Sequence, residues 1–129
     1  MNKAARRVLV VDDMASIRSV VMALLKSEGY EAYGAGNGQA ALDLLSKKQF
    51  DLVLSDWNMP EMNGSELVQR IRATDTKLPI IMVTAENDPG RVMELRDLGV
   101  NGYLIKPFKP AALMAVLGRL FPPGSKSAA

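Results

Sequence analysis

The feature that most constrains the fold of this chain is a regular alternation of short apolar runs with longer amphipathic stretches. Most of the runs have the length and β-branched character of buried strands, and turn-forming or polar residues end them. The stretches between them repeat their apolar residues at helical spacing. Five such units in succession predict an α/β fold with a parallel sheet and helices on both of its faces. The predicted strands are residues 8–11, 30–35, 52–55, 79–83 and 102–105.

The expected helix boundaries carry recognisable start and stop signals. Gly29 ends the first helix, and Asn37 caps the second. Asp88 and Pro89 are typical of an N-cap followed by the first helical residue, and that helix should end before Gly99. At 129 residues we expect a single domain, residues 1–121, and a fraying tail, residues 122–129. The apolar residues that mark the expected helices are Val20, Val21, Leu24 and Leu25 at helical spacing; Ala40, Ala41, Leu44 and Leu45 on one shared face; Leu67, Val68 and Ile71; and Leu113, Val116, Leu117 and Leu120, which give the last helix its buried face.

Polar side chains follow four of the predicted strands, at the point where each strand ends. Asp12 and Asp13 follow the first strand and Asp56 follows the third, while Thr84 and Lys106 follow the last two. In a parallel sheet these positions share one edge, which is where open α/β sheets place their ligand sites. Three close carboxylates repel one another unless a cation joins them. Mg²⁺, which keeps several of its waters, is suited to that place.

Composition narrows the chemistry further. The chain contains no histidine and no cysteine, so any metal site must be built from oxygen ligands, which argues against zinc. The absence of cysteine also fits a reducing cytoplasm. A formal net charge of +2 is too balanced to favour nucleic acid or an anionic membrane as the main partner. No apolar run is long enough for a signal-peptide core or a membrane span, and we expect a cytoplasmic protein.

Four blocks of this sequence resemble the motifs of response-regulator receiver domains, in particular those of stand-alone chemotaxis regulators. The blocks are VVDD at 10–13, SDWNMP at 55–60, MVTAE at 82–86 and GYLIKPF at 102–108. They stand in the usual order, and the likeness extends over residues 8–120. The resemblance implies a flavodoxin-like (βα)5 three-layer sandwich whose parallel five-stranded sheet has the order 2-1-3-4-5.

The resemblance also implies a phosphoacceptor site in a two-component, His-to-Asp phosphorelay. Asp56 would accept a phosphoryl group from a partner histidine kinase. One Mg²⁺ ion would be held by Asp13, Asp56 and the main-chain carbonyl of Asn58, with Asp12 reaching it through water. Because the chain has no histidine of its own, the donor must be another protein or a small acyl phosphate. Apart from self-phosphorylation and autodephosphorylation, we expect no enzymatic activity.

In the same family pattern, Lys106 pairs with the phosphoryl oxygens, Thr84 moves to hydrogen-bond them, and Tyr103 turns inward to report the event. The chemotaxis likeness implies a flagellar motor switch protein and a phosphatase as further partners. A phosphoryl sink or relay, and a detached regulatory domain that dimerises, remain open as other roles. Residues 110–117 carry no charge and lack the ion-pairing residues of receivers that dimerise on DNA, so we expect a monomer without nucleic acid.

Two other function classes compete with this interpretation. A flavodoxin-type mononucleotide binder fits the topology, but Asp12 and Asp13 would repel a phosphate after the first strand. The glycine-rich residues 34–38 have the wrong spacing for a dinucleotide fingerprint and indicate a flexible loop and helix start. A magnesium-dependent phosphohydrolase with an aspartyl-phosphate would be expected to have a second aspartate two residues after Asp56. Asn58 stands there and cannot shuttle a proton.

Overall fold

The computed structural model describes residues 6–84, 94 and 96–122. Its strands form one parallel sheet in the order β2-β1-β3-β4-β5. The strands are β1 (Arg7–Val11), β2 (Glu31–Ala35), β3 (Leu52–Asp56), β4 (Ile80–Thr84) and β5 (Gly102–Ile105). The predicted α/β class, the parallel direction and the strand order are therefore confirmed.

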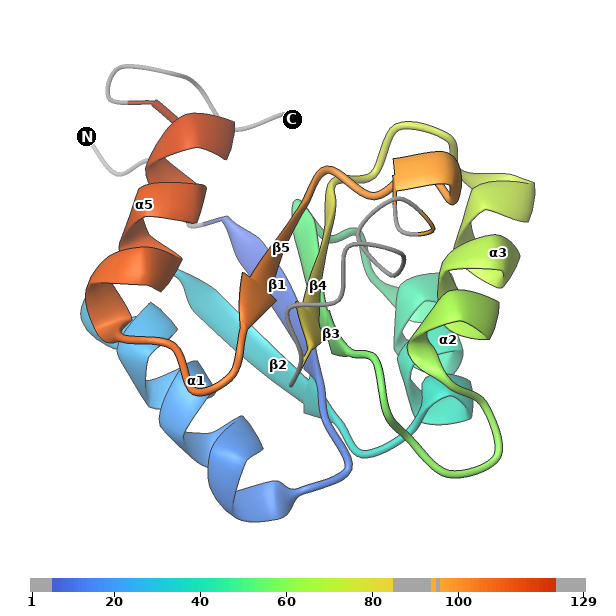
Figure 1. Ribbon diagram of the computed structural model, residues 1–129, viewed down its shortest axis with the longest axis horizontal. Helices are drawn as coiled ribbons and strands as arrows, with labels where there is room; N and C mark the ends of the chain where they lie inside the picture. Colours follow the sequence, from blue (N-terminus) through green and yellow to red (C-terminus); the bar gives the residue numbers. More distant parts are fainter. Residues whose placement is uncertain (1–5, 85–93, 95, 123–129) are drawn as a thin grey trace.

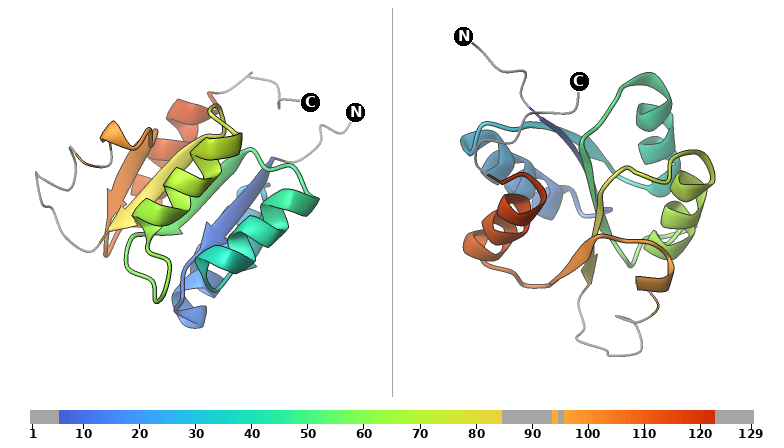
Figure 2. Two further views of the ribbon diagram at one scale, coloured as in Figure 1. Left: turned by 90° about the vertical axis from the view of Figure 1, so that its right-hand side faces the viewer. Right: turned by 90° about the horizontal axis from the view of Figure 1, so that it is seen from above.

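Helices cover both faces of the sheet and make a three-layer sandwich. In Figures 1 and 2, α1 and α5 lie on one face, and α2 and α3 lie on the other. The helices are α1 (Ala15–Ser27), α2 (Gly38–Lys47), α3 (Gly64–Thr74) and α5 (Pro110–Leu120). The predicted helix start at Asp88 and Pro89 lies outside the described residues. Tail residues 123–129 also lie outside them.

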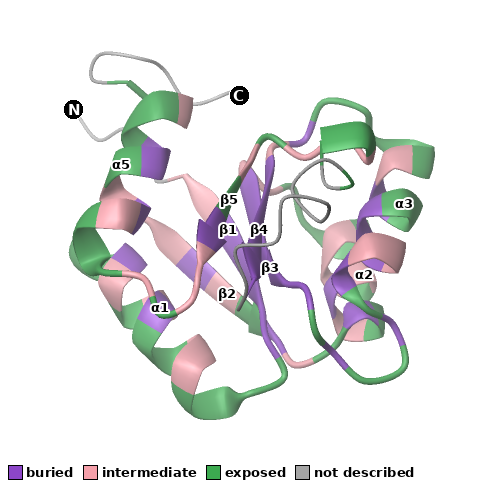
Figure 3. Ribbon diagram, in the orientation of Figure 1, coloured by how far each residue is buried: buried purple, intermediate pink, exposed green. Residues whose placement is uncertain are grey.

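The core consists of two apolar layers, one on each side of the sheet. Residues that alternate along a strand point to opposite faces, so a strand covered on both sides must be apolar throughout. The strands β3 and β4 are buried at every residue, and only the first residue of β1 is not (Figure 3). Leu9, Val53 and Met82 belong to the layer under α2 and α3. Leu25 and Leu113 belong to the layer under α1 and α5.

One side-chain cap and one glycine set two helix ends as predicted. The Asn37 side chain accepts a hydrogen bond from the Ala40 N–H at 2.8 Å, which satisfies one of the free donors at the start of α2. After α1 the backbone turns at Gly29, whose φ of 92° is costly for residues with a Cβ. These local signals fix where the chain leaves one layer and enters the next.

The structure decides two details that the sequence pattern left open. Val20 shares the helical spacing of the apolar residues of α1, yet it is 61% exposed, because the helix turns Val21 and Leu25 toward the sheet instead. Gly34 fell both in the predicted strand 30–35 and in the glycine-rich stretch 34–38 expected to be a flexible loop; the structure confirms the strand, in which Gly34 lies opposite Val10 of β1. The strand continues through the glycine because its pairing with β1 is made by the backbone.

Candidate functional site

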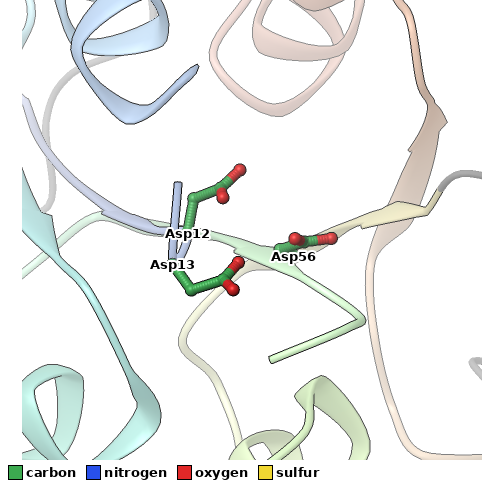
Figure 4. Close-up of side chains that lie close together, drawn as sticks. All are labelled: Asp12, Asp13 and Asp56. Atoms are coloured by element: carbon green, nitrogen blue, oxygen red, sulfur yellow. The ribbon is translucent and has the colours of Figure 1, made fainter. Parts of the chain in front are cut away.

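The carboxyl edge of the sheet gathers the acidic residues that the sequence placed at strand ends. Asp12 and Asp13 directly follow β1, and Asp56 is the last residue of β3, its immediate neighbour in the sheet. Figure 4 shows the three side chains converging in front of that edge. One carboxylate oxygen of each lies within 4.8 Å of the others. Among the described residues, this is the one group of three acidic side chains that could hold a metal ion.

The three carboxylates differ in their access to water. Asp12 and Asp56 are only 5% and 6% exposed, whereas Asp13 is an exposed residue at the mouth of the site. Burial of a carboxylate is costly unless hydrogen bonds or an opposite charge compensate it. Asp12 receives such compensation from the backbone N–H of Met14, which donates to its Oδ1 at 2.9 Å.

Lys106, the residue directly after β5, reaches across the site and joins the two buried carboxylates. Its Nζ lies 3.3 Å from Asp12 Oδ2 and 3.1 Å from Asp56 Oδ2. Its side chain is 20% exposed, so these ion pairs are partly shielded from water. Three carboxylates against one ammonium leave the site with an excess of two negative charges when all are ionised.

The electrostatics of the pair follow from this arrangement. Burial raises the pKa of Asp56, the hydrogen bond and charge of Lys106 partly counteract it, and the neighbouring Asp12 charge raises it again. Burial by itself would lower the pKa of Lys106, but its interactions with Asp56 and then Asp12 outweigh burial and raise that pKa. Lys106 therefore stays protonated beside an aspartate whose charge is only partly compensated.

The donor set fits Mg²⁺. Asp12, Asp13 and Asp56 supply oxygen ligands that are hard and anionic, and a divalent cation would neutralise the excess charge. The exposure of Asp13 leaves one side of the site open for the waters that Mg²⁺ retains. Asn58, the other predicted ligand, is exposed two residues beyond Asp56, and its backbone N–H bonds to Asp56. The role of its carbonyl stays a prediction.

The remaining predicted site residue at this edge is Thr84. It is the last residue of β4, and it is 1% exposed. It pairs with Ile105 in the register between β4 and β5, which brings it next to the strand that leads into Lys106. Its hydroxyl therefore belongs to the same end of the sheet as Asp56 and Lys106.

The loop after β3 is held close to the strand end by backbone contacts. The Gly64 N–H donates to the Trp57 carbonyl at 2.8 Å, which closes the loop onto its own start. A Cβ at Gly64 would lie 2.8 Å from the Asp56 carbonyl oxygen and would also collide with the Met82 side chain. Only glycine fits there, so this residue, which the sequence indicated merely as a turn former, shapes the backbone beside Asp56.

The sequence interpretation did not single out Arg18, which also contacts the site. Its Nη1 donates to the main-chain carbonyl of Asp12 at 2.7 Å. A charged residue near the start of a helix usually lies on the solvent-facing side of that helix. The sequence contains no motif that distinguishes Arg18 from such residues. Only the tertiary structure brings its guanidinium to the first aspartate.

Comparison with known proteins adds an independent result. Residues 8–118 match the family model of the response regulator receiver domain. The chain belongs to this receiver family. It is 41% identical to chemotaxis protein CheY-3 of Vibrio cholerae over 118 residues, which cover 89% of this chain and 91% of that protein.

Solved structures agree with this family assignment. The crystallised CheY4 of Vibrio cholerae has a TM-score of 0.88 at 40% identity, and the match covers 92% of this receiver and all of that chain. TrrA of Thermotoga maritima, solved in complex with Mg²⁺ and BeF, has a TM-score of 0.82 at 32% identity over 90% of this receiver and 99% of that chain. The mononucleotide-binding alternative loses its support, because residues 8–118, which include Asp12 and Asp13, match the receiver family model.

The predicted reporter residue, Tyr103, lies on the outer edge of the receiver. It is in β5, the edge strand, and the residue is 38% exposed. It lines a groove of about 730 Å³ between β5 and α5, together with Phe108, Lys109, Ala112 and Val116. On the opposite side of this groove, α5 contributes the uncharged residues noted in the sequence, of which Val116 is buried.

In the described part of the receiver no helix is long and apolar enough to cross a membrane.

Proposed function

We propose that this receiver is a phosphoacceptor whose Asp56 takes a phosphoryl group from the phosphohistidine of a partner kinase. The observation that carries the proposal is the carboxyl-edge cluster, in which Lys106 spans two buried carboxylates beside an exposed third. Phosphoryl transfer asks a protein mainly for positioning and for positive charge around the phosphoryl oxygens. Lys106 provides one such charge, and Mg²⁺ supplies more when it is bound.

The transfer is a displacement at phosphorus. An oxygen of the ionised Asp56 carboxylate attacks, the new P–O bond forms as the P–N bond breaks, and the electron pair of that bond returns to the donor imidazole. Asp12 and Asp13, with Asp56 and the Asn58 carbonyl, would hold the Mg²⁺ ion. Lys106 lies 3.1 Å from Asp56 and would follow the negative charge to the phosphoryl oxygens.

The hydroxyl of Thr84 would then hydrogen-bond the phosphoryl group, and Tyr103 would turn inward from its exposed position. We propose that the groove between β5 and α5 reports this change to a flagellar motor switch protein, in the cytoplasm and as a monomer. The names of the CheY relatives support this direction. A phosphatase would be a third partner. Asn58 cannot act as a general acid, so we expect slow autodephosphorylation and no hydrolase activity towards other substrates.

The test is incubation with acetyl phosphate, with and without Mg²⁺, followed by intact mass measurement. We expect the parent protein to gain one phosphoryl group in the presence of Mg²⁺, stable in acid and labile in base. The variant Asp56→Asn should gain none, and Asp43→Asn, which changes an exposed aspartate of α2, should behave as the parent does. A gain in Asp56→Asn equal to that of the parent would refute Asp56 as the acceptor.

The output is tested separately. Binding of a purified motor switch protein is measured with unphosphorylated and phosphorylated receiver, and we expect phosphorylation to tighten it. Equal affinity in both states would refute the chemotaxis output and favour the alternative role of a phosphoryl sink or relay.

A further inference from the structure

Arg18 makes a contact with the acidic cluster that the proposed chemistry does not yet use. It lies in the first turn of α1, and its side chain returns toward Asp12, the residue that directly follows β1. Its Nη1 donates to the main-chain carbonyl of Asp12 at 2.7 Å, a short hydrogen bond that carries a positive charge. The contact is with backbone, so it leaves the Asp12 carboxylate available.

Gly34 leaves the room that this side chain occupies, whereas Gly36, which also lies beside it, is not needed for space. A Cβ at Gly34 would lie 3.1 Å from Arg18 Cδ and 3.3 Å from its Nε, and 2.8 Å from Met22 Sδ. At Gly36 an added Cβ would meet Arg18 Nη1 only at 3.4 Å, which is an ordinary contact distance. Neither glycine has a positive φ, so backbone conformation does not demand them. The Arg18 side chain thus occupies the space that a side chain at Gly34 would fill.

The held carbonyl belongs to the peptide unit between Asp12 and Asp13. That unit is planar, so fixing its oxygen also orients the N–H and Cα of Asp13. On the other side of Asp12, its own N–H donates to the Ala35 carbonyl at 3.1 Å. The backbone of Asp12 is therefore held from both directions, and Arg18 supplies the constraint nearest to Asp13.

The hydrogen bond from Arg18 to the Asp12 carbonyl matters more once Asp56 accepts a phosphoryl group. Lys106 now holds the Asp12 carboxylate at 3.3 Å, but in the proposed transfer Lys106 moves with the charge of Asp56. The hydrogen bond from Arg18 to the backbone does not depend on that movement.

We propose that Arg18 is a positioning residue, which fixes the peptide between Asp12 and Asp13 and thereby sets the geometry of the metal-binding carboxylates. The inference rests on the proposed Mg²⁺-assisted function. The positioning role predicts a change in Mg²⁺ affinity, on removal of Arg18, that is opposite in sign to the change expected from the charge of Arg18 alone. Removing a cation close to acidic ligands should tighten Mg²⁺ binding by Coulomb attraction, whereas loss of positioning should weaken it.

The experiment measures the Mg²⁺ dissociation constant by titration calorimetry, together with the thermal unfolding midpoint. Arg18→Met removes the guanidinium and keeps much of the apolar stem. Gly34→Val keeps the charge but fills the path of the side chain, in a strand that favours valine. Gly36→Ala is the matched control. We expect Arg18→Met and Gly34→Val to bind Mg²⁺ about tenfold more weakly, as for other groups that orient metal ligands, and Gly36→Ala to bind like the parent.

The outcomes distinguish failure of the positioning role of Arg18 from failure of the Mg²⁺-assisted function. Parent-like or tighter Mg²⁺ binding by Arg18→Met or by Gly34→Val would overturn the positioning role alone. No Mg²⁺ binding by the parent would overturn the metal-assisted function and this inference with it. If Arg18→Met fails to fold, Gly34→Val decides, because it retains Arg18 in the chain. A role in stability only would lower the unfolding midpoint and leave the Mg²⁺ affinity of the folded protein unchanged, which also contradicts the proposal.

Discussion

Replacing Lys106 by methionine tests the electrostatics of the site most directly. The substitution keeps an apolar stem of similar length and removes the ammonium that lies 3.1 and 3.3 Å from two carboxylates. With an effective dielectric constant of about 20, each pair represents about 5 kcal/mol of Coulomb attraction, most of which offsets the cost of desolvating the charges. Breaking a fully buried pair costs about 3–5 kcal/mol.

Because the Lys106 side chain is 20% exposed, we expect a smaller loss than that limit, about 2 kcal/mol in the free energy of unfolding at pH 7 without metal. The loss should depend on pH. Lys106 lowers the pKa of Asp56, so its removal raises that pKa further above the ordinary value of 3.8. The native variant then holds this proton more firmly than the unfolded chain does, and its stability rises as the pH falls through the raised pKa.

Urea unfolding of Lys106→Met and the parent, at several pH values and with increasing MgCl2, measures these effects. Mg²⁺ binds the native state and should restore more stability to the variant, whose site carries more uncompensated negative charge. Lys109→Met, at an exposed lysine of the same segment, is the control and should change stability by less than about 0.5 kcal/mol. A loss in Lys106→Met no larger than the control, or equal stabilisation of both proteins by Mg²⁺, would refute the reasoning.

Three further predictions concern the surroundings of the site. Glu61 has a φ of 69°, so Glu61→Gly should raise the free energy of unfolding by about 0.5–1 kcal/mol; a loss of stability in urea would contradict this. Gly64→Ala should lower it by about 2 kcal/mol or more, since the new Cβ meets the Asp56 carbonyl at 2.8 Å; parent-like stability would show that the loop yields freely. Tyr103→Ala should keep phosphoryl uptake from acetyl phosphate, measured by mass, but weaken output binding, and loss of uptake would argue against a reporter role.

The sequence was sufficient for the layer architecture because its signals are local. Three kinds of signal depend on nearby residues. They are the apolar runs that are covered on both sides, the Asn37 cap and the Gly29 stop. Where an apolar pattern allowed more than one orientation of a helix, tertiary packing determined which residues are buried. The apolar stripe of α1 included Val20, but the orientation of the helix on the sheet buries Val21 and leaves Val20 in solvent.

The same division holds for the site. That Asp12, Asp13, Asp56, Thr84 and Lys106 would share one edge followed from the sequence, because parallel strands end on the same side. Distances across the sheet do not follow from spacing. Only the folded chain brings the Lys106 ammonium between two buried carboxylates, raises the pKa of Asp56 by removing it from water, and lays Arg18 through the space at Gly34. These contacts join residues far apart in sequence, and no local pattern encodes them.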